Sequence, residues 1–227
     1  MVVVDADPIW LLVDSMPPYG HSGHWHAGKP TLHVWVHGRM LLGDAGCPNY
    51  DDALYGAWFR RGPAHSAVTV DGCEDAEFVS DVRWDKPPRL EMTRCERTPD
   101  GAEISFESTG FHRLNDPVAY TRHVACSRDE LVIRDCLRSQ HGAPHIFRLH
   151  MPFLAEDVRA DGPNRCVARL AGRSVSVEWH ATAREPSAGF SEKPVSVGTR
   201  RGERPYLQVE VGGVQETEFL VRIRPDA

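Results

Sequence analysis

The sequence predicts an all-β protein, a large antiparallel sandwich of two sheets similar to the supersandwich folds. Short runs in which apolar and polar residues alternate with a period of two follow one another along the chain, as expected for strands with one buried face. Turn residues separate these runs, for example at Asp71-Gly72 and Gly212-Gly213. No sustained apolar stripe of helical period is present. The 227 residues are enough for one such domain spanning 1–227.

The expected strands are identified from this alternation, run by run. In Thr31–Val36, for example, Leu32, Val34 and Val36 share one face. In chain order the expected strands are Ile9–Val13, Thr31–Val36, Met40–Leu42, Ala67–Val70, Glu77–Val82, Arg89–Arg94, Glu103–Glu107, Ala119–Ala125, Glu130–Leu137, His145–His150, Cys166–Leu170, Ser174–Trp179, Tyr206–Val211 and Thr217–Ile223. The stretch Asp51–Phe59 has only a weak helical pattern and is expected to be a loop. Pro and Gly residues predict a long loop over 184–204, within the same domain.

Composition excludes several classes of protein. The formal net charge of −6 argues against a nucleic-acid partner and against binding to an anionic membrane surface. No apolar run approaches the roughly 18–20 residues that span a bilayer. The first residues have no basic region, and Asp5 and Asp7 interrupt their apolar run, so no secretory signal is expected and the compartment stays open. The six cysteines form no Cys-x-x-Cys pair and are expected to be mostly free thiols.

Four residues between positions 19 and 71 are candidates for joint chemistry. His24 and His26 are two residues apart, so in an extended segment their side chains point the same way. Asp44 follows one hairpin later and His65 one strand after that. Imidazole and carboxylate groups from separate strands are a ligand set suited to zinc, and three protein ligands leave a fourth position for water or a sugar oxygen. The residues alone therefore predict a zinc-bearing β domain.

A cupin-type metal oxygenase or isomerase is a weaker interpretation of the same histidines. Such a site opens with a similar His-x-His pair but needs a Glu a few residues later. Here Ala-Gly-Lys-Pro-Thr follows His26, and this segment offers no carboxylate.

The same region resembles the C-terminal β domain of heparinase II/III-like polysaccharide lyases. The resemblance is carried by Gly23-His24-Trp25-His26-Ala27, by Gly43-Asp44-Ala45-Gly46 and by the segment Phe59–Gly72, which includes Ala64-His65-Ser66 and ends in Val-Thr-Val-Asp-Gly. Order and spacing agree across residues 9–72. The closing strands from Tyr206 onward are also similar, though less diagnostic.

This resemblance implies roles for individual residues. His26, Asp44 and His65 would hold Zn²⁺, and His24 would face the substrate as a catalytic residue. The implied reaction is β-elimination of uronic-acid-containing glycans such as glycosaminoglycans or alginate, with Tyr50 or Tyr55 as a possible source of a phenol. Charge neutralisation of the substrate carboxylate is what such proton abstraction requires.

Departures from the family pattern bear on what the chain does alone. Gly28 stands where the family has Asp, and Arg61-Gly62 and Ser66-Ala67 replace hydroxyl and amide residues around the last ligand. The family's N-terminal α/α toroid has no counterpart in this sequence, so a separate helical toroid domain is an expected partner, and little activity is expected of the isolated chain.

A non-catalytic module that binds acidic glycans is the alternative hypothesis. The candidate substrate-binding residues are Arg60, Arg61 and Trp25, and in the alternative Arg200, Arg201 and Trp58 join them. Arginine side chains would meet anionic sugars, and an indole ring would stack on a sugar face. Either hypothesis makes an acidic polysaccharide or oligosaccharide the ligand.

Overall fold

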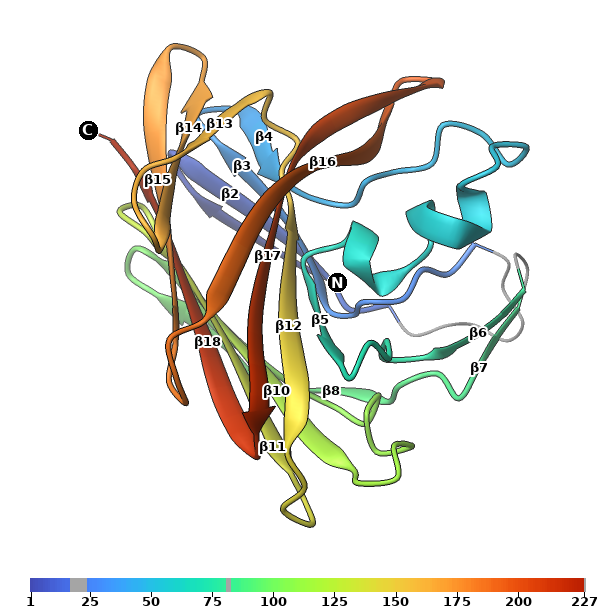
Figure 1. Ribbon diagram of the computed structural model, residues 1–227. Coiled ribbons are helices and arrows are strands. Elements are labelled where there is room, and N and C mark those ends of the chain that lie inside the picture. The colour runs from blue at the N-terminus through green and yellow to red at the C-terminus, as the bar shows by residue number, and fades with distance from the viewer. Residues whose placement is uncertain (17–23, 81–82, 227) are drawn as a thin grey trace.

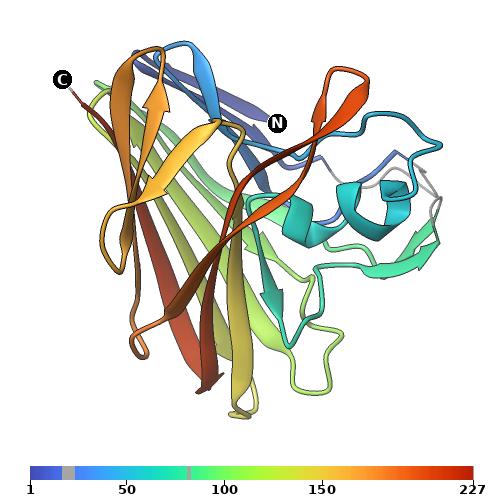
Figure 2. The same ribbon diagram turned by 45° about the horizontal axis from the view of Figure 1, so that its top comes forward.

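The computed structural model describes residues 1–16, 24–80 and 83–226 and consists almost entirely of antiparallel strands. An eight-stranded sheet forms one layer, in the order β13-β14-β15-β18-β11-β10-β9-β8. Two four-stranded sheets, β1-β2-β3-β4 and β16-β17-β12-β5, form the facing layer and meet at an antiparallel bridge between Leu42 and Phe153. Figure 1 shows the two layers, and Figure 2 shows the loops and helical turns that project beside them. The expected antiparallel β-sandwich is confirmed.

The elements have the following bounds. The strands are β1 Val2–Ala6, β2 Ile9–Asp14, β3 Thr31–Val36, β4 Arg39–Leu42, β5 Ala67–Val70, β6 Glu77–Ser80, β7 Arg83–Asp85, β8 Leu90–Thr98, β9 Gly101–Ser108, β10 Val118–Ser127, β11 Leu131–Ser139, β12 His145–Pro152, β13 Asp157–Ala160, β14 Arg165–Leu170, β15 Arg173–Ala181, β16 Ser187–Val197, β17 Arg200–Val214 and β18 Glu216–Pro225. Two short helical segments, η1 Tyr55–Phe59 and η2 Gly62–Ala64, lie between β4 and β5.

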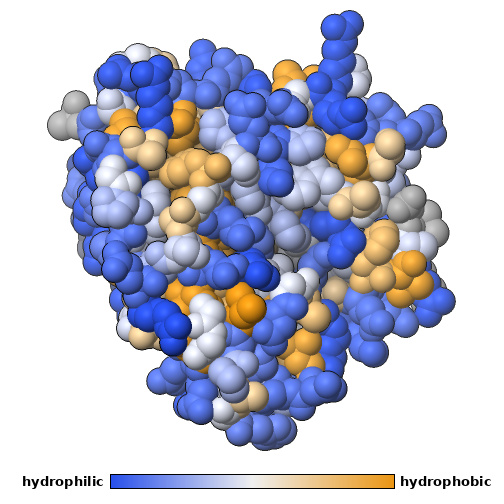
Figure 3. Space-filling model, in the orientation of Figure 1, coloured by the Kyte–Doolittle hydropathy of each residue, from blue (hydrophilic) through white to orange (hydrophobic). Residues whose placement is uncertain are grey.

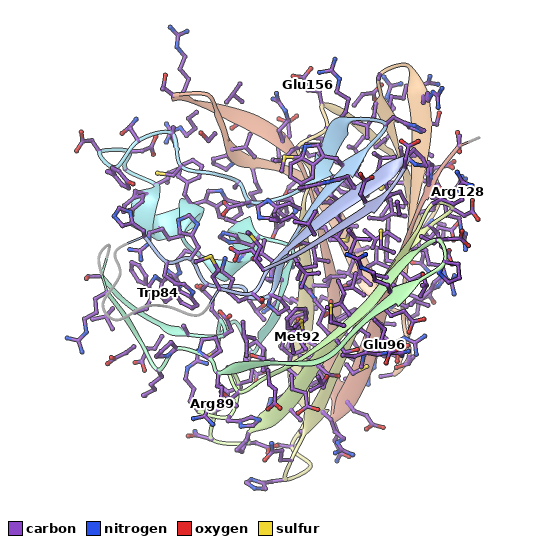
Figure 4. All side chains as sticks on the ribbon, turned by 180° about the vertical axis from the view of Figure 1, so that it is seen from behind. Trp84, Arg89, Met92, Glu96, Arg128 and Glu156 are labelled. Carbon is purple, nitrogen blue, oxygen red and sulfur yellow. The ribbon has the colours of Figure 1, made fainter. Side chains whose placement is uncertain are left out.

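One hydrophobic core lies between the layers, because alternate residues of most strands point inward. In β10, Val118, Tyr120 and Val124 are buried, whereas His123 is exposed. The inward residues of all three larger sheets belong to the same buried cluster. β8 differs, because nearly all of its residues are exposed. It is the edge strand of the eight-stranded sheet, and Figure 4 shows Met92 and Glu96 along it.

The predictions of a loop are wrong for two segments. Within Asp51–Phe59, the segment Tyr55–Phe59 is a wide helical turn in which the amide of Phe59 donates to Leu54 O at 3.1 Å. Residues 184–204 include β16 and the start of β17, which pair as a long hairpin with a two-residue turn. Pro194 is tolerated there because β16 is an edge strand, where a missing N–H breaks no ladder bond.

Other differences are smaller. The strands β1, β7 and β13 were not expected, and each is short or polar. The expected strand Glu77–Val82 ends at Ser80, and its last two residues lie outside the described residues, as does Gly23. All six cysteines are free thiols. In the part of the chain that the structure describes, no helix is long and apolar enough to cross a bilayer.

Candidate metal centre

Three side chains from separate segments converge beside the second layer. The Nδ1 atom of His26 lies 3.2 Å from His65 Nε2 and 3.3 Å from Asp44 Oδ2, and His65 Nε2 lies 3.0 Å from the same oxygen. Within the described part of the chain, these three residues form the group whose possible metal-ligand atoms all lie within 4.8 Å of one another. The fourth sequence candidate, His24, is not part of this triangle.

Hydrogen bonds between the segment Trp25–Ala27 and Arg60 hold His26 in place. The amide of Ala27 donates to Arg60 O at 3.1 Å, and the Arg60 guanidinium donates back to Trp25 O at 2.8 Å. The Trp25 ring packs edge-on against Trp84, whose indole N–H also donates to Trp25 O. These contacts tie the segment that carries His26 to the helical turn that precedes His65.

Asp44 follows β4, and its two carboxylate oxygens have different partners. Oδ1 accepts the amide of Gly46 at 2.6 Å, which leaves Oδ2 to face the two imidazoles. The neighbouring amide of Ala45 donates to Ala64 O at 2.9 Å, directly before His65 in the chain. The backbone therefore brings the carboxylate to the imidazole.

His65 is fully buried at the end of η2. Its Nδ1–H donates to Arg61 O at 2.8 Å, so a neutral ring presents the lone pair of Nε2 to the triangle. A backbone carbonyl that holds the far nitrogen is the usual way in which a protein fixes the orientation and tautomer of a metal-binding histidine.

The electrostatics of the triangle favour the protonation states that bind cations. Burial lowers the pKa of His26 below its ordinary value, against the opposing effect of Asp44. Burial alone would raise the pKa of Asp44, but the nearby His65 and His26 outweigh it and hold that pKa well below its usual range. A neutral imidazole and an ionised carboxylate are the forms that coordinate metals.

The dimensions also fit a small divalent cation. Zinc bonds to imidazole nitrogen and carboxylate oxygen are about 2.0–2.1 Å long, and two corners of a tetrahedron of that size are roughly 3.3–3.4 Å apart. The three edges of the triangle, 3.0, 3.2 and 3.3 Å, are close to this separation. His26, Asp44 and His65 could therefore hold such an ion.

An exposed histidine and tyrosine form a pair near this triangle. The hydroxyl of Tyr50 lies 3.2 Å from His24 Nδ1, and their rings meet edge to face. Tyr55 contacts Tyr50 in the same manner, but it is buried, and the Arg60 guanidinium lies over its ring. Of the two candidate tyrosines, Tyr50 is the one whose phenol is open to a ligand.

The expected substrate-binding residues occupy unequal positions. The side chains of Trp25 and Arg60 are buried, the Trp25 indole N–H donates to Met16 O and the Arg60 guanidinium donates to Trp25 O, so neither presents a surface to a ligand in this structure. Arg61 is a third exposed, forms an ion pair with Glu74 and covers the Phe78 ring. These contacts give Trp25 and Arg60 a structural place, and their expected role in substrate binding stays a prediction.

Several supporting residues were missed by sequence reasoning. Glu74 and Asp75 are buried carboxylates beneath the site, and Arg113 and Arg122 bind backbone carbonyls near it. A Glu-Asp pair after a turn, or an arginine within a strand, ordinarily indicates a solvated surface. Only the tertiary contacts distinguish them.

A sequence family described as "Heparinase II/III-like, C-terminal" matches residues 1–223. No curated protein sequence matches the chain significantly. Among solved structures, a heparinase III gene product is similar, with a TM-score of 0.76, 14% identity and coverage of 96% of this chain and 33% of that chain.

Two further structures extend this likeness. Heparan sulfate lyase HepC from Pedobacter heparinus has a TM-score of 0.75 at 18% identity, covering 96% of this chain and 33% of its own. A 4-alpha-glucanotransferase from Thermococcus litoralis has a TM-score of 0.52 at 11% identity, covering 99% and 39%. The chain thus spans about a third of the length of the heparinase structures, and at these identities the likeness shows the fold.

Proposed function

This chain belongs to the heparinase II/III-like family, as its C-terminal domain, and from that membership we propose that it is the β-sandwich part of a lyase for uronic-acid-containing polysaccharides. HepC, by its description, is a heparan sulfate lyase. The observation that carries the proposal is the convergence of His26, Asp44 and His65, together with the exposed pair that Tyr50 forms with His24, two residues before His26 in the chain.

We assign the metal-binding role to the triangle. His26, Asp44 and His65 would hold Zn²⁺, because their donor atoms and spacing suit that ion. Bound zinc would supply a fixed positive charge at the base of the site, which favours an anionic ligand.

His24 and Tyr50 are assigned to the substrate. In β-elimination the proton at C5 of the uronic acid is removed, the bond from C4 to the glycosidic oxygen breaks, and that oxygen takes up a proton. Removal of a proton beside a carboxylate is easier when hydrogen-bond donors stabilise the negative charge that develops. An exposed His24, in contact with the Tyr50 hydroxyl, can supply such a donor.

We further propose that the catalytic site is completed by a separate helical toroid domain. The chain corresponds to a third of the heparinase structures it resembles. Its exposed candidates are few, and Tyr55, Trp25 and Arg60 are buried. We therefore expect the isolated chain to bind acidic glycans but to turn them over weakly.

The test measures zinc and turnover separately. The chain is incubated with zinc and freed of excess metal, and elemental analysis should then find one zinc per chain. If it finds no zinc, the metal assignment is wrong. The chain is then incubated with heparan sulfate, alginate or hyaluronan, alone and with a heparinase-type toroid domain, while the ultraviolet absorbance of the unsaturated product is followed. Turnover should be weak with the chain alone, rise when both parts are present, and be lost with His24→Ala. His180→Ala, a change at an exposed residue of β15, is the matched control. Rapid turnover by the chain alone would contradict the proposed incompleteness.

A glycan-binding module without catalysis is the second candidate, favoured by the basic tip of the β16–β17 hairpin. Arg200 and Arg201 lie at this tip, and Arg201 reaches Asp52 at 3.4 Å in the loop that carries Tyr50. Figure 3 shows hydrophilic residues over the projecting hairpin. Salt-sensitive glycan binding that survives His24→Ala, with no turnover in any combination, would favour this function.

A further inference from the structure

Two consecutive carboxylates, Glu74 and Asp75, lie buried beneath the candidate metal centre. Their side chains follow the turn that ends β5, and they are 6% and 2% exposed. Burial raises the pKa of both carboxyl groups above the ordinary values. A buried carboxylate is costly unless hydrogen bonds satisfy its oxygens, so its partners show what it is there to hold.

Asp75 holds the loop that carries His26. One oxygen accepts the amide of Gly28 at 2.8 Å, and the other accepts the amide of Lys29 at 2.9 Å. These amides follow His26 by two and three residues. The loop passes so close to β5 at this point that a Cβ on Gly28 would lie 2.9 Å from the Cβ of Ala67.

Glu74 holds the segment that carries His65. Its Oε2 accepts the amide of Gly62 at 2.8 Å, at the first residue of η2, and its Oε1 accepts from the Arg61 guanidinium. The carbonyl of the same Arg61 accepts the Nδ1–H of His65. The residue that orients the His65 ring is thus itself fixed by Glu74.

Arg113 fixes the two carboxylates in turn. Its guanidinium donates to the carbonyls of Glu74 and Ala76, at 2.5 and 3.1 Å, and also to Gly110 O. A Cβ on Gly110 would meet the backbone of Asp75 at 2.8 Å, so glycine permits this close approach. The loop between β9 and β10, which carries Arg113, therefore holds the backbone of the segment that carries the two carboxylates.

We propose that Glu74 and Asp75 are positioning residues of the metal centre, a clamp that sets the spacing between the His26 loop and the His65 segment. This inference rests on the proposed function, because it assumes that the triangle binds a cation. Each carboxylate holds a different segment, so loss of either should move one ligand against the others. Groups that orient metal ligands typically contribute 10–100-fold to metal affinity.

Asp116 offers a matched control for a carboxylate that only stabilises a loop. It accepts the amides of His141 and Ala143 at 2.9 and 2.8 Å, much as Asp75 accepts two amides. It also contacts His145, which pairs with Asp71 beyond the end of β5, at the other end of that strand from His65.

The experiment compares Asp75→Asn, Glu74→Gln and Asp116→Asn in the full chain. Zinc affinity is measured by competition with a chromophoric chelator, and the free energy of unfolding is measured in urea without metal. The visible spectrum of the cobalt-loaded protein reports ligand geometry. Both clamp variants should bind zinc at least about 10-fold more weakly and show an altered cobalt spectrum. Asp116→Asn should lower stability and leave affinity and spectrum unchanged.

The outcomes separate the clamp from the metal assignment. Wild-type zinc binding with unchanged affinity in both clamp variants would overturn the clamp and leave the proposed function intact. A wild-type chain that binds no zinc would overturn both. If Asp75→Asn does not fold, Glu74→Gln carries the test, because the amide keeps an acceptor oxygen for the Gly62 N–H.

Discussion

Among single residues, His150 shows how burial fixes a protonation state. The side chain is 3% exposed, its Nδ1 contacts the Tyr206 hydroxyl, and its Nε2 lies 2.9 Å from Thr69 Oγ1. Burial lowers the pKa of His150 to about 3, with a smaller contribution from Arg148. The neutral ring is therefore part of the packing between β5, β12 and β17.

This protonation state predicts a pH dependence of stability. Below about pH 6.5 the unfolded chain takes up a proton at His150 that the folded chain refuses until about pH 3. The free energy of unfolding should therefore decrease as the pH is lowered from about 6.5 to about 3. The contribution from this group is at most about 1.4 kcal/mol per pH unit. His150→Gln, which cannot be protonated, should flatten the dependence, as measured by urea unfolding between pH 6.5 and pH 4 with a chelator present.

Two partly buried histidines titrate in the same pH window, so the slopes of stability against pH are compared between variants. Burial also lowers the pKa values of His26 and His33. Those contributions are common to wild type and variant and cancel in the difference. His180→Gln, at an exposed site of β15, should leave the slope unchanged. Equal slopes for wild type and His150→Gln would contradict the prediction.

The residues of the site were predictable from sequence to different degrees. His26, Asp44 and His65 stand out because residue types that bind metals occur between strands in an order and spacing that resemble a known family. The positions of Glu74 and Asp75 depend on a turn that folds them back under two loops. The periodicity of apolar residues in the sequence does not predict how such a turn directs the residues that follow it. The burial of Arg60 was not predictable, because an arginine is rarely fully buried.

At the scale of elements, most strands with one buried face were predictable, whereas four edge strands, β1, β7, β13 and β16, were not. Thr31–Val36 was found because its inward residues alternate with residues on the other face. β16 was missed because Gly189 and Pro194 suggest a loop, yet an edge strand needs hydrogen bonds on one side only. Its contacts matter for the site, since Ser196 N donates to Ala45 O at 2.6 Å, next to Asp44.

The loop before β3 provides a prediction at this scale. Gly28 has a φ of +89°, and an added Cβ would lie 2.9 Å from the Cβ of Ala67. Gly28→Ala should lose about 1–2 kcal/mol through the left-handed backbone, and about 1–3 kcal/mol more through the steric contact. It should also weaken zinc binding, because His26 lies on the displaced loop. Urea unfolding and chelator competition measure the two effects.

Gly172→Ala, in the turn between β14 and β15, isolates the backbone contribution. Gly172 has a φ of +81°, and no heavy atom lies within 4 Å of its added Cβ. This variant should lose stability through the backbone alone and bind zinc normally. If the two alanine variants behave alike, the close approach of the loop to β5 has no bearing on the site.

For the whole molecule, one buried ion pair connects the eight-stranded sheet to the site loops. Arg122 of β10 donates to both oxygens of Asp135 on β11, at 2.6 and 2.8 Å, and the two side chains are at most 1% exposed. The Arg122 guanidinium also donates to Pro30 O and Ser66 O, at 2.7 and 2.6 Å. The second of these carbonyls belongs to the residue after His65.

Removal of the counter-charge should therefore be far more damaging than loss of a surface pair. Asp135→Asn leaves a buried guanidinium without its carboxylate and should lower the free energy of unfolding by about 3–5 kcal/mol. Arg94→Met removes a half-exposed arginine that pairs with Glu96 and Glu103, and should cost little, because exposed ion pairs contribute little to stability. Urea unfolding of both variants gives the comparison, and equal losses would contradict the role assigned to the buried pair.

A double variant tests whether the pair acts through its charges or through the backbone it holds. Buried ion pairs can often be replaced by apolar residues at little cost, because the desolvation penalty disappears along with the attraction. In Arg122→Met with Asp135→Leu, however, the carbonyls of Pro30 and Ser66 lose their donor, at roughly 1–3 kcal/mol for each buried carbonyl left unsatisfied. The double variant should therefore recover only part of the stability lost in Asp135→Asn. Full recovery would mean that the sheet supports the site loops by packing alone.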